Sequence, residues 1–204
     1  MSIATELAPQ RRGRPRDASV DARVLRAAQE LFAVHGWHGF SFEQVAKLAG
    51  VGKSSLYRRW RDREALFLQA LSEAGFRDTD IDTGAVRTDL LALARNYGAW
   101  LEGPNGPVGL RITLETRMNR DFARVVRRAK FPSVTVSHQI VRRAKARGEL
   151  PADASTAVIL EGVLGGVAMH LITSGKGGPA FDSASGDRFL TRLVGYVLDG
   201  ASRL

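Results

Sequence analysis

The amino-acid sequence predicts an all-α protein, and three observations support this prediction. From about residue 19 onward, apolar residues recur every three or four positions, which is the period of a helix that buries one face. Glycine- and proline-rich breaks, such as residues 103–107 and 175–179, separate these stretches. No run of any length alternates apolar and polar residues as a half-buried strand does.

A basic segment precedes the first predicted helix. Residues 10–16 are Gln-Arg-Arg-Gly-Arg-Pro-Arg and lack apolar periodicity, so residues 1–18 are predicted to be a disordered basic arm. Arginines in such arms can enter the minor groove of A·T-rich DNA, where negative potential is concentrated. Arg14 and Arg16 are therefore candidate DNA contacts, and the alternative is a basic tail that contacts phosphates nonspecifically.

Residues 19–75 predict a first domain that begins with a helix from about Ser19. A second helix follows over residues 41–49, because the Ser41 hydroxyl can accept a hydrogen bond from its first turn. Gly50 ends this helix, since the residue after a helix often needs a positive φ, which glycine adopts at little cost.

Two further helices complete the predicted first domain. Gly52 or Lys53 opens a short helix on which Leu56 and Trp60 share the buried face. Asp62 can cap the helix that follows. Two short helices joined by a tight glycine turn are the layout of a helix-turn-helix, whose second helix lies in the DNA major groove.

The run from residue 32 to residue 66 resembles the N-terminal domain of TetR-family transcriptional regulators. Gly52 stands where the family usually has Ser or Thr, and Arg63 where it usually has Lys. Arg59-Trp60 stands where His-Phe is usual. The match continues without a gap, and its matching residues are Phe32, Gly36-Trp37, Phe40-Ser41, Val45-Ala46, Ala49-Gly50-Val51, Lys53, Leu56-Tyr57, Trp60, Asp62-Arg63 and Leu66.

The resemblance implies an N-terminal three-helix helix-turn-helix DNA-binding domain, residues 19–75, and a C-terminal helical ligand-binding and dimerisation domain, residues 76–204. It also implies that the Tyr57 hydroxyl contacts a phosphate and that Arg59 takes over the phosphate contact of the family's histidine. Residues at the start of a recognition helix reach base edges or nearby phosphates, and N–H groups at helix starts hold phosphates. The other candidate DNA contacts are Lys53, Ser54, Ser55 and Arg58 on the recognition helix, and Ser41 and Arg63 at the starts of their helices.

Charge and composition agree with a DNA-binding protein. The net charge is +9, and residues 1–63 hold 12 Lys and Arg against 6 Asp and Glu. Such a concentration of positive charge suits a polyanion, although solubilising surface charge is an alternative. The chain has no cysteine, and we find no paired carboxylates, nucleophile motif or metal-ligand spacing. We therefore expect a protein that is not an enzyme and that needs no cofactor and no metal.

The C-terminal half is predicted to be helical throughout. A polar connector follows Phe76, and Pro132 is expected to kink or restart the long basic stretch, because proline lacks the N–H that a helix interior requires. The predicted helices span residues 85–102, 108–117, 119–147, 153–174 and 187–204.

The last two predicted helices carry apolar residues on more than one side. A helix of this kind must be buried on several faces, and a subunit interface would provide that burial. The resemblance points the same way, because the family's last two helices pair in a four-helix dimer interface. The alternative is an ordinary monomer core. The interface candidates are Leu160, Leu164, Gly165, Leu190, Leu193, Val194 and Val197.

The resemblance also implies a small-molecule pocket among the middle helices. Its candidate lining residues each have a plainer alternative: core packing for the aromatic residues and methionines, and a surface ion pair for Glu115. The two histidines lack a partner at metal-ligand spacing, so a metal site is not favoured. The candidates are Trp100, Glu115, Met118, Phe122, His138, Met169 and His170.

These features together predict a sequence-specific, dimeric transcriptional regulator that binds a palindromic double-stranded DNA operator. A ligand-responsive repressor with an unknown small-molecule inducer is the favoured form, and activation remains open. The alternative is a nonspecific architectural DNA-binding protein without a sensor function. We expect the protein in the cytoplasm and not in a membrane, because no apolar run reaches about 18 residues and the N-terminus lacks a signal peptide's apolar core.

Overall fold

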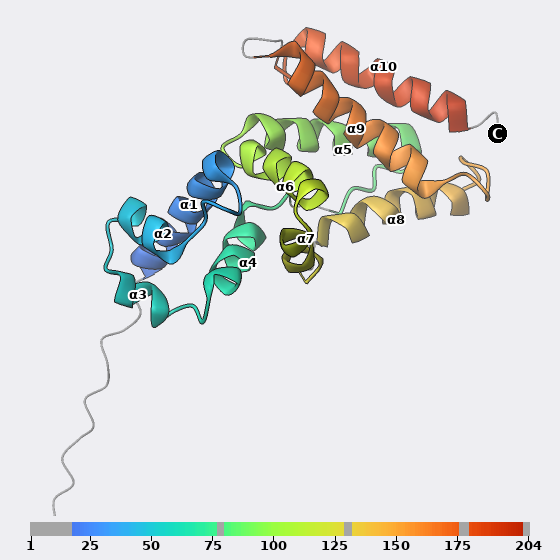
Figure 1. Ribbon diagram of the computed structural model, residues 1–204. Coiled ribbons are helices and arrows are strands. Elements are labelled where there is room, and N and C mark those ends of the chain that lie inside the picture. Colours follow the sequence, from blue (N-terminus) through green and yellow to red (C-terminus); the bar gives the residue numbers. More distant parts are fainter. Residues whose placement is uncertain (1–17, 77–79, 129–131, 176–179, 202–204) are drawn as a thin grey trace, which may run out of the picture.

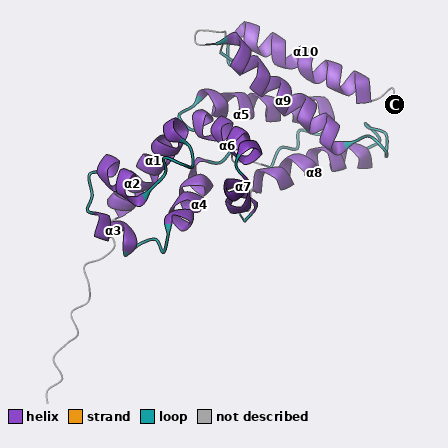
Figure 2. Ribbon diagram, viewed as in Figure 1, coloured by secondary structure: helices purple, strands orange, loops and turns teal. Residues whose placement is uncertain are grey.

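The computed structural model describes residues 18–76, 80–128, 132–175 and 180–201. Within these residues the protein has ten helices and no strand, which confirms the predicted all-α fold (Figure 2). The first four helices form one end of the molecule, and the last two lie at the opposite end (Figure 1). Arg14 and Arg16 of the predicted arm lie outside the described residues.

The predicted caps of the N-terminal helices are confirmed. Ser41 Oγ accepts a hydrogen bond from the Gln44 N–H at 3.3 Å, and Asp62 Oδ1 accepts one from the Ala65 N–H at 2.8 Å. Gly50 ends the second helix with a φ of 64°. The four helices are α1 (Ala18–His35), α2 (Phe42–Ala49), α3 (Lys53–Tyr57) and α4 (Arg63–Ala74).

Six more helices complete the described chain. Pro132 restarts the long basic stretch as expected. Three helices begin elsewhere than predicted: one begins at Gly106 instead of residue 108, one begins at Thr156, where Ser155 Oγ caps it, and the last begins at Ala184 instead of Asp187. The six helices are α5 (Val86–Glu102), α6 (Gly106–Met118), α7 (Arg120–Arg127), α8 (Pro132–Ala146), α9 (Thr156–Ser174) and α10 (Ala184–Ala201).

An aromatic cluster fills the core of the N-terminal end. Phe32, Trp37, Phe40 and Phe67 are buried there, with ring centroids 4.7 to 5.7 Å apart in each contacting pair. Phe122 of α7 joins this cluster, stacking on Phe32 at 5.3 Å. Offset and edge-to-face aromatic pairs stabilise a core beyond the area they bury. A residue of the second predicted domain is therefore part of the core of the first.

A second core holds α5, α8, α9 and α10 together. Its buried residues include Leu90 and Leu93 of α5, Ile140 of α8 and Leu190 of α10. The helix α5 lies in the middle, in contact with the other three. The middle of the chain is thus bound to both ends of the molecule, since α6 and α7 also pack on the N-terminal helices.

The helix α9 is unusually apolar for its exposure. Of the helices in the described part of the chain, it alone is long and apolar enough by length and composition to span a membrane, a property that we did not expect from the sequence. Only 22% of its apolar window is buried. An apolar helix that its own chain leaves uncovered requires another surface against it.

Candidate nucleic-acid interface and ligand cavity

The helix α3 separates a buried apolar face from an exposed polar one. Leu56 and Trp60 are buried, as predicted, and anchor the helix end in the N-terminal core. The opposite face is exposed to solvent and carries hydrogen-bond donors of the kind that contact bases and phosphates. The exposed residues are Lys53, Ser54, Tyr57 and Arg58.

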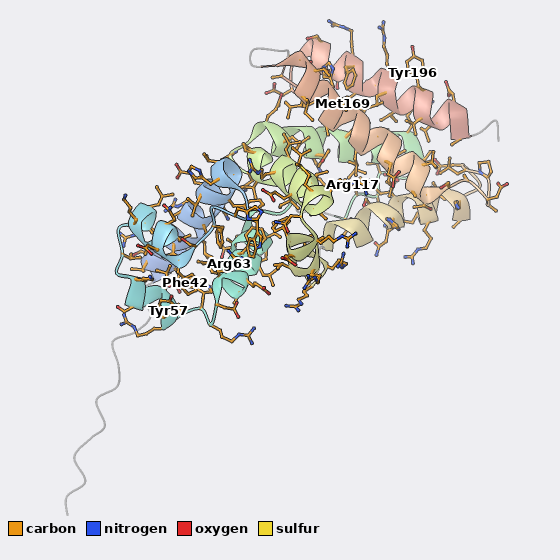
Figure 3. All side chains as sticks on the ribbon, in the orientation of Figure 1. Phe42, Tyr57, Arg63, Arg117, Met169 and Tyr196 are labelled. Carbon is orange, nitrogen blue, oxygen red and sulfur yellow. The ribbon has the colours of Figure 1, made fainter. Side chains whose placement is uncertain are left out.

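Tyr57 and Lys53 are held at this surface by weak contacts. The Tyr57 side chain packs edge-on against Phe42 with ring centroids 4.9 Å apart and stays 58% exposed (Figure 3). Lys53 Nζ lies 3.5 Å from Glu43 Oε2, and both side chains are mostly exposed. Exposed ion pairs contribute little free energy, so the Lys53 ammonium can exchange Glu43 for a phosphate.

Arg59 does not lie on the exposed face. Its Nε pairs with Asp21 of α1, and its Nη1 donates to the carbonyl oxygen and the hydroxyl of Ser55. Only 15% of the Arg59 side chain is exposed. Internal acceptors therefore occupy the guanidinium in this conformation, and the predicted phosphate contact would require their release. The Ser55 hydroxyl oxygen accepts a hydrogen bond from the same guanidinium.

Ser41 and Arg63 have local roles beside the predicted interface. The Ser41 hydroxyl caps α2, and Arg63 Nη1 donates to the carbonyl of Phe40 at 3.2 Å. The Arg63 guanidinium also lies over the Trp37 ring, 4.3 Å from its centroid. Arg63 nevertheless remains exposed, so its free edge faces solvent at the start of α4.

Two cavities lie next to α5, α6 and α9. The first, of about 290 Å³, reaches the end of α4 and touches Leu71, Trp100 and Val108. The second, of about 620 Å³, follows α9 and touches His138 and Met169. The two cavities adjoin, because four residues line both of them: Tyr97, Thr113, Ser137 and Leu164.

The predicted pocket residues divide into two groups. Trp100, His138 and Met169 line the cavities as predicted. The other four do not line these two cavities, and Phe122 and Glu115 follow the plainer alternatives of core packing and an ion pair. Phe122 is buried in the N-terminal core, Met118 is 84% exposed, Glu115 pairs with Arg111, and His170 stacks on Phe189 with ring centroids 3.8 Å apart.

The lining of the two cavities is mostly apolar, with a few polar groups. Burial raises the pKa of Tyr97, so its phenol stays protonated and can donate a hydrogen bond. Ser137, a lining residue, is itself buried. Among the described lining residues, the ionisable groups other than Tyr97 are His138 and Glu161, both exposed at the α9 side.

Comparison with known proteins identifies the family. A model described as bacterial regulatory proteins of the tetR family matches residues 24–70, and one described as a tetracyclin repressor-like C-terminal domain matches residues 80–193. The chain belongs to the TetR family. It is a DNA-binding transcriptional regulator with the helix-turn-helix at its N-terminal end.

Individual relatives span nearly the whole chain. The DNA-binding transcriptional repressor TetR of Mycobacteroides abscessus is 31% identical over 87% of this chain and 90% of its own. The regulator AqdR of Rhodococcus erythropolis is 29% identical over 79% of this chain and 78% of its own. A TetR-family crystal structure with 29% identity covers 89% of this chain and 98% of its own, with a TM-score of 0.57.

For this TetR-family chain, the structure separates the predicted interface residues by burial. Leu160, Leu190 and Val194 are buried within the single chain, which favours the alternative of an ordinary monomer core for these three residues. Leu164, Leu193 and Val197 are half-buried, and Gly165 is exposed. The sequence reasoning missed four exposed apolar residues on the same two helices: Val158, Met169, Ile172 and Tyr196.

Proposed function

We propose that this TetR-family protein is a ligand-responsive repressor that binds a palindromic operator as a homodimer. The observation that carries the proposal is the position of α6. Its Thr113 lines the cavity, while its Glu115 accepts a hydrogen bond from the Trp37 N–H at 3.4 Å. One helix therefore touches both the proposed ligand and the DNA-binding end.

The contacts of α3 support operator recognition. Lys53, Ser54 and Arg58 present donors on an exposed face, with Tyr57 beside them. Base-edge contacts specify a sequence, and phosphate contacts set position and affinity. We assign Arg58 and the start of α3 to base and phosphate contacts, and Arg63 to a phosphate contact at the start of α4. The location that follows from this role is the cytoplasm, where the chromosome lies.

The uncovered apolar surface of α9 and α10 supports the homodimer. Val158 and Tyr196 are 65% and 75% exposed, and both line a groove of about 430 Å³ between the two helices. Gly162 lines this groove, and a Cβ on it would lie 3.1 Å from Val197 Cγ2, so the glycine lets α9 and α10 of one chain pack closely. A second copy would cover this surface, and two recognition helices related by a two-fold axis match a palindrome.

The lining of the cavity supports an uncharged, largely apolar inducer. Trp100 and Tyr97 stack with ring centroids 5.7 Å apart and form an aromatic wall. Tyr97 and Thr113 offer hydrogen bonds to one polar group of the ligand. A charged ligand would lose its hydration without a described counter-charge in the narrower cavity, which is energetically costly.

Selection of bound duplexes from a random pool tests this proposal. We expect an enriched palindrome that the protein binds about 1,000-fold more tightly than scrambled DNA at the same salt concentration. Equal affinity for both duplexes would favour the nonspecific architectural alternative. Metabolites are then screened for release of the selected operator, and a reporter placed behind that operator distinguishes repression from activation.

A further inference from the structure

The recognition helix α3 is too short to hold its own orientation. It has five residues, and Gly52 precedes it without a side-chain cap. Nucleation of a helix is costly, so a helix of this length depends on tertiary contacts. Leu56 supplies an apolar contact on one side. The polar contacts at the other side come from Arg59.

The Arg59 side chain replaces a backbone hydrogen bond at the end of α3. In a continued α-helix the N–H of Arg59 would bond to the carbonyl of Ser55. This N–H instead donates to Leu56 O at 2.9 Å, and the Trp60 N–H donates to the same oxygen at 2.8 Å. Arg59 Nη1 donates to the Ser55 carbonyl at 3.2 Å. The guanidinium therefore satisfies a carbonyl that the helix end would leave open.

The same guanidinium ties α3 to α1. Arg59 Nε pairs with Oδ1 of Asp21, a residue in the first turn of α1. The Asp21 side chain is 30% exposed and the Arg59 side chain 15%, so water screens this pair less than a surface pair. The planar fork of arginine can bond to Asp21 and Ser55 at once, which a lysine ammonium on its flexible stem cannot reproduce.

We propose that Arg59 is a positioning residue that fixes α3 on α1 through Asp21 and Ser55, and that it does not bind DNA phosphate. A phosphate ligand at this position would need the guanidinium free, whereas here Asp21 already supplies the anion. The chain thus uses Arg59 to orient the exposed donors of α3 before DNA arrives.

The effect of Asp21→Asn on operator affinity has opposite signs under the two roles. If Arg59 bound phosphate, removal of the competing Asp21 carboxylate would free it, and the loss of a negative charge near DNA would also help. The affinity would then stay equal or rise. If Arg59 positions α3, we expect Asp21→Asn to bind the selected operator about tenfold more weakly, because the uncharged amide oxygen of Asn accepts a weaker hydrogen bond from Arg59 than the carboxylate does.

Two substitutions of Arg59 give an independent measurement. Lys keeps the charge and binds phosphate as a point charge, so Arg59→Lys would preserve affinity under the phosphate role and lose it under the positioning role. Arg59→Ala separates the roles by salt dependence. Log affinity falls as log salt rises, and each lost phosphate contact reduces the steepness of this fall by about 0.9. We expect Arg59→Ala to keep the steepness of the wild type. Arg58→Ala, the matched control, should show a shallower salt dependence.

Binding is measured by fluorescence anisotropy with the selected operator duplex, using the full chain and a stoichiometric titration of the active fraction. This titration separates weaker binding from loss of folded protein. Asp21→Glu, which keeps the carboxylate, is expected to retain more affinity than Asp21→Asn. The proposal is overturned if Asp21→Asn binds as well as the wild type, or if Arg59→Ala loses the slope of one phosphate contact.

Discussion

Gly36 and Gly50 share a backbone conformation but differ in their surroundings. Their φ angles are 63° and 64°, in the left-handed region that side chains with a Cβ disfavour. A Cβ on Gly36 would overlap Glu115 Oε1 and the Arg111 guanidinium. A Cβ on Gly50 would meet no heavy atom of the described residues within 4 Å. Only Gly36 therefore also makes room for side chains of α6.

We expect Gly50→Ala to lower the free energy of unfolding by about 1–2 kcal/mol, the strain of the left-handed conformation. Gly36→Ala should lower it further, because Glu115 must also leave the Trp37 N–H. Urea unfolding followed by circular dichroism measures both losses. Equal losses for the two variants would show that α6 does not rest on Gly36.

Local chemistry explains which residues could be predicted from the sequence. Ser41, Gly50 and Asp62 act on neighbours within five residues, so their capping roles follow from spacing alone. The partners of Arg59 and Phe122 lie in helices distant in the sequence, at Asp21 and in the aromatic core. Such tertiary contacts have no local pattern, which is why the sequence did not indicate these partners for either residue.

At the scale of elements, α5 begins with a cap from a distant part of the chain. Ala85 precedes it without a side-chain cap. Glu149 Oε2 accepts a hydrogen bond from the Val86 N–H at 2.5 Å, and Arg147 pairs with both Glu149 and the buried Asp89. The Val86 N–H and then Arg147 lower the pKa of Glu149 below its ordinary value.

Glu149→Gln is expected to lower the free energy of unfolding at pH 7 by about 1 kcal/mol, as the loss of a helix cap does. The pKa of Glu149 is lower in the folded protein than in the unfolded chain, where it is near 4.5. The carboxylate therefore stabilises the fold fully above the unfolded pKa, and this stabilisation is lost as the pH falls through the folded pKa. The difference between wild type and variant should therefore shrink below about pH 4.5. Urea unfolding across this range measures it, with exposed Glu30→Gln as the control. A difference that stays constant with pH would contradict the role of the ionised cap.

The exposed apolar residues of α9 and α10 give a prediction about assembly. We expect Tyr196→Glu to convert the proposed dimer to a monomer at micromolar concentration, since a carboxylate would be buried without a partner. Val34→Glu, at a site 63% exposed on α1, is the matched control and should leave the dimer intact. Sedimentation equilibrium measures the mass. A dimeric Tyr196→Glu variant would remove this surface from the interface.

The sequence predicted the helices better than the faces they bury. Their periodicity and breakers located most ends to within a few residues. The burial of Leu160, Leu190 and Val194 depends on how α5 packs against α9 and α10, which periodicity does not specify when a helix is apolar on several sides. The cavity residues Tyr97 and Ser137 were missed for the same reason, because only packing brings their helices together.

For the whole molecule, the composition of the cavity predicts selectivity between two related dyes. N-phenyl-1-naphthylamine is uncharged, and 8-anilino-1-naphthalenesulfonate adds a sulfonate to similar rings. We expect the uncharged dye to bind at least about tenfold more tightly, because the sulfonate would be desolvated without a counter-charge. Energy transfer from tryptophan to the dye, compared between the wild type and Trp100→Phe, reports the site, because Trp37 and Trp60 remain in the variant.

Thr113 lines both cavities, so the larger ring of Thr113→Phe should fill dye-binding space and abolish the energy transfer. Val34→Phe, on the exposed side of α1, should not change it. Preferential binding of the sulfonate would contradict the uncharged ligand class while leaving operator binding unaffected.

The position of Phe122 limits how this regulator can be recombined. Its ring completes a core that Val108 of α6 and Val125 of α7 also enter, so the DNA-binding end is not a detachable module. A hybrid that joins residues 1–75 to the C-terminal domain of another regulator would lack the Phe122 ring and leave a cavity among Phe32, Trp37 and Phe67. When DNA-binding domains are exchanged between relatives, α6 and α7 must therefore be transferred together with α1 to α4, as two separate segments of the chain.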